Sequence, residues 1–133
     1  MPGTTETYLL ADEAGGRWTF HISWSNLEDS TVDAPHLAVF CNPAANARQD
    51  QDCTPARPTD GMQLPLQLIN MALEHGIAPE LALSALIGHQ GPWPRLWPVR
   101  TPDGVLPYAN GTGIPLPTVI GKLALNLLTK VCT

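Results

Sequence analysis

The sequence has few charged residues and few cysteines, and it lacks a long apolar run. Only 14% of its 133 residues are charged, whereas 44% are hydrophobic, as expected for a folded globular chain. The three cysteines do not form a CxxC pair, so neither a disulfide framework nor a zinc site is predicted, and a reducing compartment fits best. No stretch approaches the roughly 18 apolar residues that could span a bilayer, and no signal peptide is recognisable. We therefore expect one cytoplasmic domain without membrane association.

Basic residues are especially scarce. Seven basic residues stand against twelve acidic ones, a net charge of −5, whereas nucleic-acid-binding proteins are usually basic. Nucleic acid is therefore not an expected partner. The imbalance is uneven, because residues 1–78 hold ten acids and three bases, and residues 79–133 hold two acids and four bases. A small anionic ligand should prefer the second part of the chain.

The first third of the chain has the pattern of β-structure. From Arg17 to Trp24, aromatic and aliphatic residues alternate with polar ones, which is typical of a half-buried strand with an aromatic core side. The Gly15-Gly16 pair predicts a hairpin turn, with a possible preceding strand at residues 7–10. A short apolar run at residues 37–41 predicts a further strand.

The remaining chain is mostly helical in pattern. Residues 61–88 contain two helical segments, separated where Gly76 fits a helix C-terminus and Pro79 fits a helix start. Residues 117–131 form a third amphipathic stripe. We predict one α+β domain in which a small antiparallel sheet of two or three strands is backed by two or three helices. Its expected parts are the sheet (7–41), a connector (43–60), helices (61–88), a ligand loop (89–116) and a C-terminal helix (117–131).

The ligand loop is the main candidate for a functional site. The segment from Gly88 to Pro115 is rich in proline, yet it holds three aromatic residues and two arginines. Long loops in compact domains are often binding loops. Aromatic faces can stack on a flat ring, and guanidinium groups can hold phosphate. The candidate ligand-binding residues are His89, Trp93, Arg95, Trp97, Arg100, Asp103 and Tyr108.

Structural roles for the same residues remain open. The tryptophans could fill the core or a dimer interface while the arginines face solvent. Asp103 precedes Gly104 and could form a turn, or it could accept a hydrogen bond from a ribose hydroxyl. No nucleophile elbow, phosphate-binding loop, dinucleotide motif or metal-ligand spacing is present. We therefore expect no catalytic residues, no metal and no cofactor, and a protein that is not an enzyme.

A small sheet is only marginally stable alone, and symmetric dimers are the commonest assemblies. We therefore expect a homo-oligomer, a dimer or higher.

Three features of residues 37–128 resemble the TSCPD domain, found at the C-terminus of vitamin B12-dependent ribonucleotide reductases and as a free-standing module in bacteria and phages. They are the Val39-Phe40 pair that ends a strand, the helix–Gly-Ile–helix turn of residues 72–80, and the Ile114–Pro117 segment before the last helix. This resemblance implies an α+β fold and an accessory role in nucleotide sensing or interaction.

The overall layout is also similar to phage sponge proteins, which counter Thoeris-type immunity by sequestering cyclic ADP-ribose-like signals or cyclic oligonucleotides. This architectural resemblance implies a non-enzymatic binder of a small nucleotide ligand, in the host cytoplasm if the chain is phage-encoded. The alternatives are an accessory domain of ribonucleotide reductase and a phage protein that inhibits another protein.

Overall fold

A computed structural model describes residues 4–25, 34–44, 57–89, 91–100 and 113–131. The elements follow one another in the order β1 (Thr4–Asp12), β2 (Arg17–Ser25), β3 (His36–Pro43), the 3-10 helix η1 (Pro58–Met62), α1 (Gln63–Glu74), α2 (Pro79–Ser84), β4 (Arg95–Arg100), β5 (Ile114–Pro115) and α3 (Leu116–Val131).

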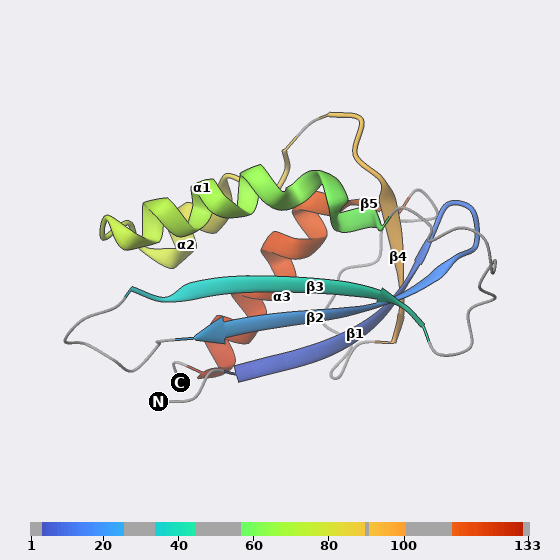
Figure 1. Cartoon of the computed structure of the whole chain (residues 1–133), viewed down its shortest axis with the longest axis horizontal. Coiled ribbons are helices and arrows are strands. Elements are labelled where there is room, and N and C mark those ends of the chain that lie inside the picture. The colour runs from blue at the N-terminus through green and yellow to red at the C-terminus, as the bar shows by residue number, and fades with distance from the viewer. Residues whose placement is uncertain (1–3, 26–33, 45–56, 90, 101–112, 132–133) are drawn as a thin grey trace.

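The strands form one open antiparallel sheet in the order β3-β2-β1-β4-β5. Figure 1 shows α3 crossing behind the strands, with α1 and α2 lying along the β3 side. The prediction of an antiparallel sheet backed by helices is confirmed. The expected number of two or three strands was too low, because the described residues contain five.

The two unpredicted strands come from the segment that the sequence analysis treated as a loop. Proline argues against a strand because it cannot donate a ladder hydrogen bond, and it is tolerated at edges and bulges. Pro98 lies in β4 opposite Leu10, next to a shift in register between Leu9 and Leu10. On its other side, β4 pairs with only two residues of β5, opposite Arg95 and Leu96. The proline therefore lies beyond the short ladder with β5, where a missing donor costs little.

The β1–β2 hairpin is closed by one carboxylate. Oδ1 of Asp12 accepts hydrogen bonds from the backbone N–H groups of Ala14 and Gly16, at 3.0 and 2.7 Å, and Oδ2 accepts one from Nε1 of Trp18 at 2.7 Å. Gly15 has φ +85°, a conformation that glycine adopts without strain. The predicted Gly-Gly turn is thus confirmed, and Asp12 fixes its geometry.

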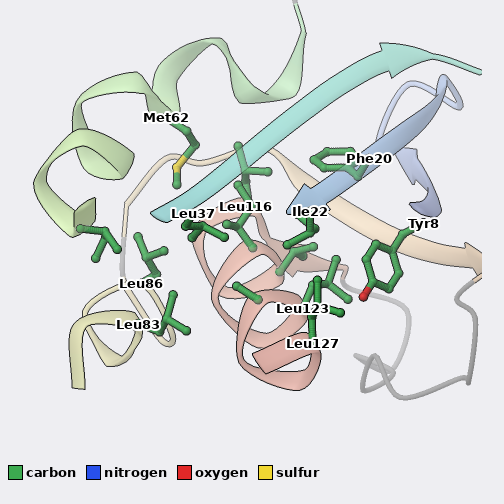
Figure 2. Close-up of a cluster of buried hydrophobic side chains, with 14 of the residues drawn as sticks. Tyr8, Phe20, Ile22, Leu37, Met62, Leu83, Leu86, Leu116, Leu123 and Leu127 are labelled. Atoms are coloured by element: carbon green, nitrogen blue, oxygen red, sulfur yellow. The ribbon is translucent and has the colours of Figure 1, made fainter. Parts of the chain in front are cut away.

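The buried core lies between one face of the sheet and α3. The alternation predicted in β2 is confirmed, because Trp18, Phe20, Ile22 and Trp24 are all buried. In Figure 2, side chains from the strands, η1 and α2 gather around α3. A buried hydrogen bond from Nε1 of Trp24 to the carbonyl oxygen of Ala124, 2.8 Å long, joins β2 to this helix.

The turn between α1 and α2 lies at Gly76, as predicted from the sequence. Gly76 has φ +86°, its N–H donates to the carbonyl of Leu73, and the N–H of Ile77 donates to the carbonyl of Ala72. These two bonds are those of a Schellman motif, which satisfies the last carbonyls of a helix. The following helix, α2, ends at Ser84, before the predicted end at Gly88, because residues 85–88 continue as single turns.

One side chain attaches α1 to the edge strand β3. Oδ1 of Asn70 accepts a hydrogen bond from the N–H of Leu37 at 2.8 Å, and Nδ2 of Asn70 donates to the carbonyl of Leu37 at 2.9 Å. The amide thereby occupies the two backbone groups of Leu37 that a further strand would use at this position. This contact also sets the position of η1 and α1 relative to the strand, and so shapes the space between them.

Candidate ligand-binding site

A pocket of about 490 Å³ lies where the edge strand β3 meets η1 and the start of α1. Ligand pockets in proteins usually measure about 300–1,000 Å³ and combine apolar walls with a few polar groups. We call this space the edge pocket. Its lining residues are His21, Val39, Phe40, Cys41, Asn42, Arg57, Thr59, Asp60, Gln63 and Leu66.

The lining offers an aromatic surface. Phe40 is 60% exposed, although it lies within a strand. It lies on the polar side of the sheet opposite His21, whose Nδ1 is 3.0 Å from Oγ1 of Thr7. Phe40 neither packs in the core nor pairs with another described ring, so its side chain is accessible to a ligand. The phenyl face can therefore receive a flat ring.

The edge pocket also carries polar groups from β3, from η1 and the residue before it, and from α1. Among the described residues of the lining, Arg57 supplies the only guanidinium, and Asn42 of β3 and Gln63 of α1 supply amides that both donate and accept hydrogen bonds. Asp60 is held in place, since one of its carboxylate oxygens accepts the N–H of Arg57 at 3.0 Å. Its second oxygen can accept a hydrogen bond from a ligand hydroxyl.

The Cys41 thiol in the edge pocket is not activated as a nucleophile. Burial raises the pKa of Cys41 to about 12, although the Arg57 charge and a hydrogen bond with Thr59 act in the opposite direction. Nucleophilic cysteines need a lowered pKa and some exposure. The Cys41 thiol therefore stays protonated near neutral pH and contributes an apolar surface.

The described residues of the sequence-predicted ligand site lie in two separate places. His89 and Trp93 are neighbours, with ring centroids 6.1 Å apart and planes tilted by 60°. Trp93 is partly buried against the core. Both rings line a small apolar pocket of about 230 Å³, and none of the described residues that line it is an arginine.

Arg95 and Trp97 lie elsewhere, on the polar face of the sheet. They alternate with buried Leu96 along β4. The indole of Trp97 lies against Gly113, where an added Cβ would be 2.9 Å from two ring carbons, and Nη1 of Arg95 donates to the carbonyl of Gly113 at 3.2 Å. Trp97 pairs with Ala11, which in turn pairs with Arg17. The guanidinium of Arg95 and the indole of Trp97 thus lie close together on this face, both beside Gly113.

For the other predicted ligand residues, the structure does not describe the side chains. The backbone of Arg100 belongs to β4 opposite Leu9, while Asp103 and Tyr108 lie outside the described residues.

Sequence reasoning missed the edge pocket because its lining comes from segments far apart in the chain. The signal that could have indicated it is Phe40, a large aromatic on the polar side of its strand. Arg57 was assigned to the connector (43–60), because nothing adjacent to it in the sequence indicates that it lies beside β3.

No protein family model, no curated protein and no solved structure matches the chain. The resemblances to TSCPD domains and to phage sponge proteins therefore stay predictions. Among the described residues, no helix is both long and apolar enough to cross a bilayer. In the same part of the chain, no cluster of three or more His, Cys, Asp or Glu residues could hold a metal ion.

Proposed function

We propose that this protein binds and sequesters a small nucleotide-derived anion in the edge pocket, without chemical turnover. The observation that carries this proposal is the convergence of an exposed phenyl ring, a guanidinium and two amides in one pocket of ligand size. Each group matches a different part of a nucleotide. Cys41, the thiol among the described lining residues, is protonated near neutral pH and so offers no nucleophile.

The roles follow from the chemistry of each group. Phe40 stacks on the base, a contact worth about 1–3 kcal/mol in nucleic-acid complexes. Arg57 contacts phosphate through a charge-assisted hydrogen bond. Asn42 and Gln63 contact the base edge, and Asp60 accepts from a ribose hydroxyl. A ligand held in this way needs no catalytic group to be retained.

The most concrete biological version is a sponge for a cyclic ADP-ribose-like signal or a cyclic oligonucleotide, which counters bacterial immune signalling. A cyclic signal presents the base, ribose and phosphate that the edge pocket can contact. Its removal from solution by a protein in excess is enough to silence a receptor.

Calorimetry with a panel of cyclic and linear nucleotides tests this function. We expect at least one cyclic species to bind and to be recovered chemically unchanged from denatured protein. Binding of linear deoxynucleotides alone would instead support the accessory role with ribonucleotide reductase. Absence of nucleotide binding, or recovery of an altered ligand, would contradict the proposal.

Two variants locate the ligand. Phe40→Ala and Arg57→Ala should each weaken binding by tenfold or more, equivalent to about 1.4 kcal/mol, because they remove the stacking surface and the phosphate contact. Both side chains are exposed, so the melting temperature should change little. Arg95→Ala is the matched control, because Arg95 lies on β4, which β2 and β1 separate from β3, and it should leave affinity unchanged. The reverse result would place the ligand beside Trp97, as the sequence alone predicts.

A further inference from the structure

The helical layer has an exposed apolar surface that the edge pocket does not use. Five of the six large hydrophobic side chains that are exposed in the described residues lie on α1, on the turn after it, or on α2: Leu64 (62% exposed), Leu68 (54%), Met71 (46%), Ile77 (40%) and Leu81 (64%). Single exposed leucines are normal, but an apolar cluster marks an interaction surface.

Three of these residues form a continuous line on α1. Leu64, Leu68 and Met71 are separated by four and then three residues, so they lie above one another on one side of the helix. We call this line the α1 seam. The buried residues Ile69 and Leu73 lie on the opposite side of the helix. α1 is therefore apolar on two sides, as is typical of a helix that is covered on both.

The spacing of the seam suits a second helix as the covering element. A step of four and then three residues is the a/d pattern by which one helix packs along another. The flanking residues Gln67 and Ala72 are uncharged, and the charged flanking residue Glu74 lies at the C-terminal end of α1, away from Leu68.

The small apolar pocket adjoins the α1 seam. It is lined by Leu68 together with Pro65, Ile69, Ala85, Leu86, His89, Trp93 and Pro117. The same surface thus presents protruding leucine side chains and an apolar hole beside them. A surface that carries both partners of a contact can pair with itself across a two-fold axis.

We propose that the α1 seam is the homodimer interface, with the α1 helices of two copies packed antiparallel about an axis near Leu68. In this arrangement Leu64 of one protomer faces Met71 of its partner. Apolar side chains of each seam fill the small pocket beside Trp93 in the other protomer. His89 and Trp93 then serve as interface residues, and the interface leaves the edge pocket open.

Sedimentation equilibrium across micromolar concentrations tests the interface. We expect the wild-type protein to be a dimer and Leu64→Gln or Leu68→Gln to be a folded monomer, because glutamine has a helix propensity similar to that of leucine. Phe40→Gln is the control, since that side chain is equally exposed but lies on the sheet, and this variant should remain dimeric. A monomeric wild-type protein, or a dimer that survives both seam substitutions, would overturn the proposal.

Cross-linking tests the antiparallel orientation, in a background with Cys53→Ser and Cys132→Ser. Leu68→Cys should form an intermolecular disulfide, because two copies of this position meet at the axis. Leu64→Cys should not, since its two copies are offset by about 10 Å along the helices at 1.5 Å per residue, beyond the reach of a disulfide. Efficient cross-linking through Leu64→Cys and not through Leu68→Cys would refute the antiparallel arrangement.

Discussion

At the scale of single residues, Asn70 has an effect larger than its size suggests. It satisfies both the N–H and the C=O of Leu37, two groups that lie at the edge of the sheet beneath α1. A polar group left without a partner in a partly buried place costs about 1–3 kcal/mol. Removal of the Asn70 amide is therefore expected to lower stability mainly because the N–H and C=O of Leu37 lose their hydrogen-bond partner.

We expect Asn70→Ala to lower the free energy of unfolding by about 2–4 kcal/mol, because both backbone groups lose their partner. Urea denaturation measures this change. Asn70→Asp should have an intermediate effect, since a carboxylate still accepts from the N–H of Leu37 but cannot donate to its carbonyl. Equal stability of the alanine variant and the wild type would show that water replaces the amide at no cost.

Cys41 gives the fold a pH dependence at alkaline pH. Its pKa is raised from 9.0 to about 12 by burial. Below pH 9 the thiol is neutral in both the folded and the unfolded chain, so it has no effect on the pH dependence there. Between pH 9 and 12 the unfolded chain loses this proton and the folded chain keeps it, so stability falls as the pH rises.

The slope from this thiol approaches about 1.4 kcal/mol per pH unit within that window. Thermal unfolding of the wild type and of Cys41→Ala, compared at pH 8 and pH 10, isolates it from other titrating groups. We expect the wild type to lose more stability than the variant over this interval. Parallel losses would mean that the Cys41 thiolate forms in the folded protein as readily as in the unfolded chain.

At the scale of elements, the contact between α2 and α3 depends on a glycine inside a helix. A Cβ added to Gly121 would lie 2.7 Å from Cγ1 of Ile87 and 3.2 Å from Cβ of Leu86. In an exposed helix, replacing glycine by alanine stabilises by up to about 1 kcal/mol. Here that gain is opposed by a clash with tightly packed neighbours.

Gly121→Ala should therefore lower the melting temperature, since overpacking a core costs about 1–3 kcal/mol. Gly61→Ala is the matched control, because its added Cβ would meet only one ring carbon of Trp93, at an ordinary contact distance of 3.4 Å. We expect the control variant to melt at or above the wild-type temperature. Stabilisation by Gly121→Ala would show that the turn after α2 can move away from α3.

Sequence patterns correctly predicted those elements that depend on residues close together in the chain. The alternation in β2, the Gly76 helix end and the apolar stripe of α3 each follow from residues adjacent in sequence or one helical turn apart. β4 and β5 could not be found in this way. A strand containing Pro98 exists only because β1 offers it a bulged partner, and two residues of β5 have no pattern of their own.

The candidate site shows the same division. The sequence analysis predicted that aromatic and guanidinium groups contact the ligand, and it took these groups from one stretch of the chain. The structure gathers a phenyl ring from β3, a guanidinium from the segment before η1 and an amide from α1. His89 and Trp93, expected to clamp the ligand with Arg95, line an apolar surface without it.

At the scale of the whole molecule, strand order and chain order differ in a way that affects biosynthesis. The central strand β1 precedes its partner β4, which begins only at Arg95, and the core is closed by α3, the last of the described elements. The β1–β2–β3 meander therefore leaves the ribosome with its aromatic side uncovered. Until the sixteen residues of α3 follow, the nascent chain resembles an aggregation-prone intermediate, and chaperone protection matters most in that interval.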